Sequence, residues 1–316
     1  MITIHDSQRI SRNQILSEEP SVYFIGEALD DRGQLIHNQL SNVDIHQVFQ
    51  MSFNVSDYKI KINNDFYSCR EIANTLKSIL EPFIEMPIII DSTTLGFIEI
   101  LFILRWFSTL PDKEMLVIYI EPAEYKSRTN YMSDYGKHEF DLSSHSSGFK
   151  AVPGFSKMVE PSNRVNLVSI LGFERARLGQ LLQLDEGAYI DKVFPVFATP
   201  SFKAGWDKHS FYQNVETLQG KSMRPEFVSA DSPIDLINTL EKIKSSLDQD
   251  LLMLAPFGSK PLSVGAAVFL VNFKDEVILK YDHPVKKSGR SNGIGLIHSY
   301  KLKVSVTTAQ QPHLPS

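Results

Sequence analysis

The stretch LLMLAPFGSKPLSVGAAVFL, residues 251–270, decides the fold. An apolar run of strand character ends at Phe257, the turn GSKP follows at 258–261, and small and apolar residues typical of a buried helix come next. A uniformly apolar strand that leads through a short turn into a helix is half of a βαβ unit, in which strands pair in parallel. The stretch therefore predicts an α/β protein with a largely parallel sheet.

The same alternation of apolar runs and amphipathic stretches recurs along the chain. It predicts strands at 22–25, 46–53, 88–90, 115–120, 165–171, 193–197, 226–229, 251–255 and 277–281, and a hairpin at 58–69. It predicts helices at 70–83, 95–107, 175–184, 207–218, 234–247 and 262–273. Pro195 lies inside one predicted strand, which favours an edge position or a bulge there. This order is typical of a doubly wound, Rossmann-like sheet, in one large domain or in two lobes.

The regular pattern fails between residues 123 and 163, where Ser, Gly, Tyr and Lys dominate. Long irregular segments in a compact chain are usually functional or mobile. We therefore expect an N-terminal Rossmann-like lobe at 15–122, an irregular linker or insertion at 123–163 and a C-terminal Rossmann-like lobe at 164–303. The end of the chain, 307–316, is polar and proline-containing, and we expect it to be disordered.

Composition narrows the class of protein. The 316 residues are 42% hydrophobic and 22% charged, which excludes a fibrous or wholly disordered chain. A net charge of -5 argues against general nucleic-acid binding by the whole chain. The single cysteine, Cys69, excludes an intramolecular disulfide and fits a reducing compartment. The first residues show no signal peptide, and the most apolar window is too short to span a bilayer, so we expect a cytoplasmic protein with no membrane partner.

Three residues of the deciding stretch predict an anion site. Backbone N–H groups at a helix start attract anions, helped by the helix dipole. Gly258 would let the backbone approach a ligand, the Ser259 hydroxyl could donate to a phosphate oxygen, and Lys260 would supply positive charge. The alternative is an ordinary turn with a solvated lysine, since turn chemistry alone also explains glycine and proline here.

This segment resembles the CRISPR-associated Rossmann-fold sensor domains, in which a strand is followed by a Gly-Gly-Thr-Lys-Pro-like turn and a helix of small residues. Gly258, Ser259, Lys260 and Pro261 match the later part of that pattern, while Phe257 stands where the family tends to have glycine. The resemblance covers about twenty residues of the 316. It implies a nucleotide or phosphate site, because the family binds cyclic oligoadenylates, and a sensing role in antiviral defence.

Other candidate residues follow predicted strands, because ligands of open parallel sheets bind beyond the carboxyl ends of the strands. Asp91, Ser92, Thr93 and Thr94 offer a carboxylate and three hydroxyls for a ribose or phosphate, or they form an ordinary helix cap. Asp91, Glu121 and Glu174 are the candidate general acids or bases, and the alternative for Glu121 and Glu174 is that each is a solvated loop residue.

The stretch from Lys280 to Lys303 has six Lys or Arg residues against one acidic residue. Lys286 and Lys287 at its centre are flanked by Ser, Gly and Asn, which fits a basic flap over an anion bound at Lys260. The alternatives are a solvated loop and a contact with nucleic acid.

The leading hypothesis is therefore a sensor or interaction protein that binds a nucleotide or another phosphorylated small molecule. The first alternative is a hydrolase or transferase that acts on such a ligand, and the second is a nucleic-acid-contacting subunit of a larger assembly. A homo-oligomer or larger complex fits the sensor and subunit hypotheses. No sequence pattern points to a cofactor or to a metal site, so neither is expected.

Overall fold

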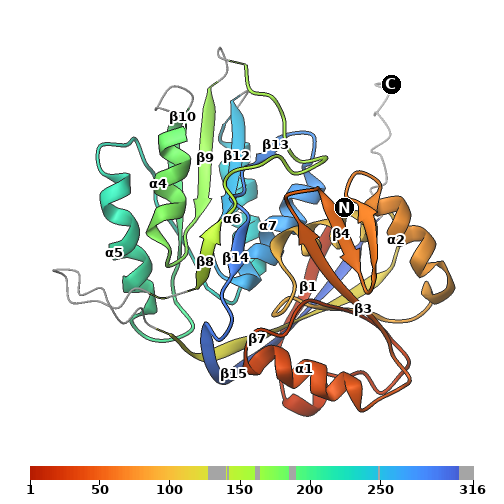
Figure 1. Ribbon diagram of the computed structural model, residues 1–316. Coiled ribbons are helices and arrows are strands. Elements are labelled where there is room, and N and C mark those ends of the chain that lie inside the picture. The colour runs from red at the N-terminus through yellow and green to blue at the C-terminus, as the bar shows by residue number, and fades with distance from the viewer. Residues whose placement is uncertain (127–139, 141, 161–163, 185–189, 248–249, 306–316) are drawn as a thin grey trace, which may run out of the picture.

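The computed structural model describes residues 1–126, 140, 142–160, 164–184, 190–247 and 250–305. These residues form a mixed α/β fold with an eight-stranded and a five-stranded sheet side by side (Figure 1). A short antiparallel pair, β8 (Ser143–Ser146) with β14 (Pro284–Lys286), adds a third small sheet. The predicted α/β class is confirmed.

The eight-stranded sheet is mixed. Its order is β1 (Ile2–Ile10), β15 (Ser291–Val304), β7 (Glu114–Tyr125), β6 (Ile88–Asp91), β2 (Val22–Ile25), β3 (Gln47–Asn54), β4 (Lys59–Ile62) and β5 (Asp65–Ser68). The central strands β7, β6, β2 and β3 pair in parallel, and all pairs outside them are antiparallel. The prediction of a largely parallel sheet is wrong here, because β15 and the β4–β5 hairpin flank the parallel centre with antiparallel strands.

The five-stranded sheet is parallel throughout, as predicted. Its order is β11 (Glu226–Val228), β10 (Ile190–Ala198), β9 (Val165–Ile170), β12 (Leu251–Pro256) and β13 (Val277–Leu279). The chain first builds outward from β9 to β11 and then continues on the other side with β12. Strand order therefore reverses between β9 and β12, where open parallel sheets bind ligands.

The helices connect these strands. They are α1 (Asp31–Ser41), α2 (Ile72–Leu80), α3 (Phe97–Phe107), α4 (Arg175–Leu184), α5 (Trp206–Leu218), α6 (Pro233–Ser245) and α7 (Lys260–Asn272), with short 3-10 turns at Arg12–Gln14 and Glu81–Phe83. The Ser232 hydroxyl caps α6 by accepting the N–H of Asp235 at 3.2 Å. No described helix is long and apolar enough to cross a membrane.

The five-stranded sheet is covered on both faces. Val165 and Leu167 of β9 belong to the hydrophobic cluster that includes Leu178 of α4. Val168 of β9 belongs instead to the cluster that includes Leu240 of α6. Because successive strand residues point to opposite faces, an apolar run such as β9 fits a strand with helices on both sides.

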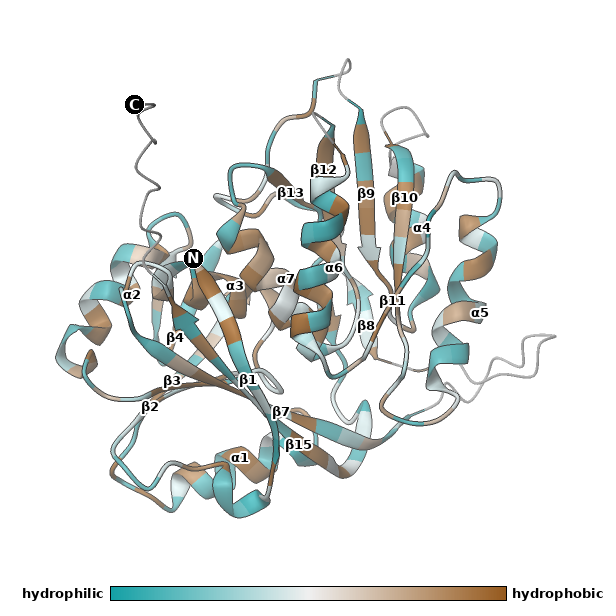
Figure 2. Ribbon diagram, turned by 180° about the vertical axis from the view of Figure 1, so that it is seen from behind, coloured by the Kyte–Doolittle hydropathy of each residue, from teal (hydrophilic) through white to brown (hydrophobic). Residues whose placement is uncertain are grey.

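Helices α3 and α7 lie between the two sheets, and α7 is seen there in Figure 1. Nearly every residue of both helices is buried, and one hydrophobic cluster joins Ile100 of α3 and Val268 of α7 to Phe24 of β2 and Leu254 of β12. Figure 2 shows the contrast with α6, which carries both teal and brown residues. The two sheets therefore share one core, which fixes the carboxyl ends of their strands relative to each other.

The chain crosses the expected lobe boundaries. Strand β7 continues to Tyr125, past the end of the lobe expected at 15–122. Strand β15, from the lobe expected at 164–303, pairs with β7 and β1 in the eight-stranded sheet. The tail expected at 307–316 lies outside the described residues, as do 127–139, 141 and 161–163 of the expected linker.

The prediction for Pro195 is wrong, because β10 is an interior strand between β9 and β11. The irregularity in the β9–β10 register lies between Ile190 and Lys192, before the proline. Pairing of β10 with β11 begins only at Val196, one residue after Pro195. The proline is tolerated because it precedes the first residue of β10 that pairs with β11, so no hydrogen bond of that ladder needs its N–H group.

Candidate functional site

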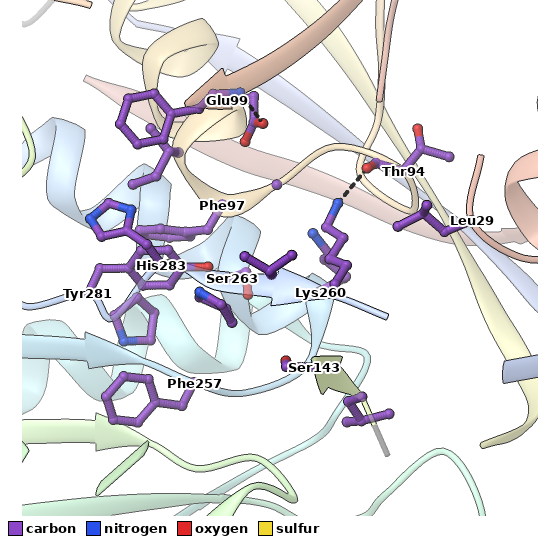
Figure 3. A pocket seen from close by; sticks show the side chains of 18 of the residues that line it. Leu29, Thr94, Phe97, Glu99, Ser143, Phe257, Lys260, Ser263, Tyr281 and His283 are labelled. Atoms are coloured by element: carbon purple, nitrogen blue, oxygen red, sulfur yellow. Dashed lines mark hydrogen bonds between the residues drawn. The ribbon is translucent and has the colours of Figure 1, made fainter. Parts of the chain in front are cut away.

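The carboxyl ends of the two sheets border one cavity of about 350 Å³. Thr94 and Phe97 follow β6 of the eight-stranded sheet, while Lys260 and Tyr281 follow β12 and β13 of the five-stranded sheet. Figure 3 shows these side chains around the opening. The cavity therefore lies where both sheets present their strand ends, and side chains distant in sequence meet in it.

The GSKP turn lines the cavity, but two of its residues are engaged in the fold. The Ser259 hydroxyl donates to Ala230 O at 2.7 Å and accepts the N–H of Leu262 at 3.5 Å as the cap of α7. A Cβ added at Gly258 would lie 2.6 Å from Cγ2 of Ile170 in β9, so the glycine permits close packing against that strand. Helix α7 starts at Lys260, two residues before the predicted helix.

Two lysines reach into the cavity from different elements, and both hold the loop after β6. The Lys260 ammonium donates to Leu95 O, and the Lys286 ammonium donates to Thr94 O at 2.6 Å. Lys286 belongs to β14, which pairs with β8 at the edge of the cavity. The predicted proximity of Lys286 to Lys260 is thus present in the structure.

Arginines add to this positive charge. Arg290 lies between β14 and β15 and lines the cavity. Among the described residues its guanidinium makes no ion pair, and its buried Nε has no hydrogen-bond partner. Arg32 also lines the cavity, but Asp30 neutralises it at 2.6 Å. Lys260, Lys286 and Arg290 therefore form a cation cluster whose members contact no carboxylate among the described residues.

The pKa values of this cluster report its environment. Burial, followed by the positive charges of Lys286 and Arg290, lowers the pKa of Lys260 well below its usual value. Burial and the charge of Arg290 lower the pKa of Lys286 from 10.5 to about 8. Cations that are desolvated and repel one another are stabilised by an anion placed among them.

The opposite side of the cavity is aromatic and carries one carboxylate. Phe97 and Tyr281 lie with ring centroids 4.9 Å apart, and Tyr281 and His283 with centroids 5.2 Å apart. Glu99 of α3 is buried beside them, and its Oε1 accepts the N–H of Phe53 at 2.8 Å. Figure 3 shows Phe97, Tyr281 and His283 across the cavity from Lys260.

Glu174 is the one candidate acid or base that lines the cavity. Its carboxylate lies 3.8 Å from Arg177, whose guanidinium also pairs with the fully buried Asp282 at 2.5 Å and stacks 4.5 Å from the Phe257 ring centroid. Arg177 therefore anchors the strand ends of β9, β12 and β13 to one another and leaves Glu174 partly exposed.

Asp91, Ser92 and Thr93 are buried and bond to the fold instead of lining the cavity. Asp91 accepts the Thr93 N–H at 2.9 Å and the Thr94 hydroxyl. The Ser92 hydroxyl donates to Ile118 O at 2.8 Å, and the Thr93 hydroxyl accepts the Ile120 N–H at 3.0 Å. The helix-cap alternative is also incorrect, because α3 starts after Gly96 with no side-chain cap.

Glu121 and Lys287 lie away from the cavity lining. Glu121 is an interior residue of β7 instead of a strand-end residue, and it is buried against His298, whose Nε2 lies 2.6 Å from its Oε1. Lys287 is exposed, and its backbone N–H donates to Leu142 O at 3.1 Å. Neither residue is placed to act on a molecule in the cavity.

Several cavity residues were not singled out as site residues from the sequence, chiefly Glu99, Tyr281, His283 and Arg290. Glu99 had a signal, because a carboxylate inside an otherwise apolar helix needs a buried partner or a function. His283 has a φ of 47°, and its pKa is lowered by burial, neither of which is visible in a sequence.

No family model matches this chain, and no curated protein matches it significantly. The described residues contain no group of three or more His, Cys, Asp or Glu side chains that could hold a metal ion. The cavity is therefore the main structural feature that bears on function.

Proposed function

We propose that this protein binds a small phosphorylated ligand of the nucleotide class in the cavity between its two sheets. The observation that carries the proposal is the cluster of Lys260, Lys286 and Arg290, three desolvated cations that contact no carboxylate in the described part of the chain. Phosphate oxygens would accept from the ammonium and guanidinium groups and relieve their mutual repulsion.

The position and size of the cavity support this proposal. The strand order of the five-stranded sheet is that of a doubly wound, Rossmann-like unit, and Phe257 to Lys260 follow a strand at its reversal point. The parallel centre of the eight-stranded sheet reverses between β2 and β6, and Thr94 follows β6. A volume of about 350 Å³ falls within the range of roughly 300–1,000 Å³ typical of small-molecule sites.

We favour a sensor over an enzyme. Of the three candidate acids or bases, Asp91 and Glu121 are tied into the fold, and Glu174 is held beside Arg177. Because each of these three carboxylates is paired within the fold, reversible binding fits the cavity better than acid–base catalysis through them. The resemblance of the GSKP turn to antiviral sensor domains is consistent with this role. An enzyme acting through Glu174 remains the second candidate, and turnover of a bound nucleotide that Glu174→Gln abolishes would favour it.

A thermal-shift assay with nucleoside monophosphates and ribose 5-phosphate tests the proposal. We expect at least one of these probes to raise the melting temperature of the wild type, because a ligand that binds only the folded state stabilises it. Lys260→Ala and Lys286→Ala should remove most of that increase. Lys77→Ala, at an exposed position of α2, is the matched control and should leave it unchanged.

Stabilisation that survives both cavity substitutions would place the ligand elsewhere and overturn the proposal. The same conclusion follows if Lys77→Ala reduces the ligand-induced rise in melting temperature as much as Lys286→Ala does. Binding of the anion would then depend only on the net charge of the protein.

A further inference from the structure

Glu99 presents one carboxylate oxygen that the fold does not use. Its Oε1 accepts the Phe53 N–H at 2.8 Å, which fixes the carboxylate, whereas Oε2 makes no hydrogen bond within the described residues. Glu99 lines the cavity, and it lies in the first turn of the buried helix α3. An isolated buried carboxylate is unfavourable unless a donor reaches it, so this oxygen is suited to accept from a ligand.

Aromatic rings surround this carboxylate. Phe53 and His283 have centroids 5.6 Å apart, and His283, Tyr281 and Phe97 continue the row. Burial lowers the pKa of His283, so its ring is neutral at physiological pH. These uncharged rings offer contact surface to a flat heteroaromatic group and offer little to free phosphate.

The two ends of the cavity carry opposite charge without neutralising each other. No ion pair within 4.0 Å joins Glu99 to Lys260, Lys286 or Arg290 in the described chain. Glu99 nevertheless acts on both lysines through space, since its charge raises their pKa values. The cavity therefore presents an acceptor at Glu99 and donors at the cation cluster, and a molecule with an anion at one end and an N–H donor at the other complements both.

We infer that the aromatic end of the cavity recognises a nucleobase with an exocyclic amino group, which packs against the rings of Phe97, Tyr281 and His283 and donates to Oε2 of Glu99. The inference rests on the proposed function, because it assigns the phosphate to Lys260, Lys286 and Arg290. It narrows the ligand class from any phosphorylated small molecule to amino-bearing nucleotides.

Matched nucleotide pairs that differ by one amino group test this inference. The pairs are adenosine and purine riboside monophosphates, guanosine and inosine monophosphates, and cytidine and pyrimidin-2-one riboside monophosphates, with ribose 5-phosphate as a probe that has no base. In calorimetric titration the wild type should bind the amino-bearing member of at least one pair about tenfold more tightly or better, as a hydrogen bond to a buried carboxylate predicts.

Glu99→Gln keeps an acceptor for the Phe53 N–H but can turn an amide donor towards the ligand. This variant should reduce the ratio of the two affinities within a pair to below about twofold. The melting temperature of the ligand-free variant should stay close to that of the wild type. Glu19→Gln, at an exposed position, is the control and should preserve the ratio. Lys286→Ala should weaken both members of the pair equally, because it acts on the shared phosphate.

The outcomes separate this inference from the proposed function. Ribose 5-phosphate that binds as tightly as every nucleotide, and that depends on Lys286, would overturn base recognition and leave the anion site intact. A preference for the amino group that persists in Glu99→Gln would overturn the role of Glu99. If no probe binds in a manner dependent on Lys286, both proposals fall.

Discussion

Two turns at corresponding places in the two sheets differ in what their side chains contact. The turn after β6, residues 91–96, and the turn after β12, residues 257–259, each follow a strand beside the reversal of strand order and lead into a buried helix. In the first turn the side chain of Asp91 bonds within the turn, and the hydroxyls of Ser92 and Thr93 bond to β7. After the second turn, Lys260 reaches across the cavity to the loop of the first.

This difference shows why position in the topology alone does not identify a functional residue. Both turns have the polar residues expected at a strand end. The first turn's side chains are short enough to be satisfied by backbone groups two or three residues away, or on the next strand. Lys260 and Lys286 are long, and their ammonium groups reach the cavity before they meet a carbonyl. Side-chain reach and the available local partners decide which side chains enter the cavity.

The largest expected loss of stability comes from a substitution in the first turn. Asp91→Ala should lower the free energy of unfolding by about 3 kcal/mol, because it leaves the buried Thr93 N–H and Thr94 hydroxyl without their acceptor. The corresponding change in the second turn, Ser259→Ala, should cost about 1 kcal/mol, the usual value for a helix cap. Urea denaturation measures both. If Ser259→Ala proves as costly as Asp91→Ala, the contrast between a structural turn and a ligand-facing turn is lost.

The sequence predicted much of this architecture because local patterns determine local structure. The apolar run at 165–171 and the helix at 175–184 correspond closely to β9 and α4. The pairing partner of β15 was not predictable in the same way, since a strand from the end of the chain joins the first sheet through contacts remote in sequence. Glu121 was placed at a strand end because Pro122 resembles a terminator, whereas β7 continues to Tyr125.

The candidate site was only partly visible for the same reason. Lys260 lies within a recognisable strand–turn–helix pattern, so it was identified, and Lys286 was identified from local charge. The carboxylate of Glu99 and the rings of Tyr281 and His283 enter the same cavity only because α3 and β13 converge there. No spacing in the sequence encodes that convergence.

A pH titration sharpens the comparison, because it measures the repulsion between the cations that lie between the two turns. Lys286 has a pKa of about 8 in the folded state and 10.5 as a free side chain, so between these values the unfolded chain binds more protons. Stability of the ligand-free protein should therefore rise with pH across that window, by at most about 1.4 kcal/mol per pH unit for this group. Lys286→Met should remove this rise.

Urea denaturation of both proteins at pH 7.5, 8.5 and 9.5 measures the difference, which also includes the release of Lys260 from the charge of Lys286. A bound anion should raise the pKa of Lys286 and flatten the wild-type curve. A wild-type curve parallel to that of Lys286→Met would show that the ammonium is well solvated, and the cation cluster would lose its basis.

The smallest expected changes in stability come from substituting two serines, one beside each sheet. The hydroxyl of Ser92 donates to Ile118 O at 2.8 Å, whereas the fully buried hydroxyl of Ser169 in β9, opposite Pro195, has no hydrogen-bond partner among the described residues. Ser92→Ala should therefore destabilise the protein by about 1 kcal/mol, and Ser169→Ala should stabilise it by up to about 1 kcal/mol, because burial of an unsatisfied hydroxyl is unfavourable. Thermal denaturation of the two variants gives the sign directly. Destabilisation by Ser169→Ala would mean that this hydroxyl has a partner in solution, and the two sheets would then satisfy their buried polar groups equally well.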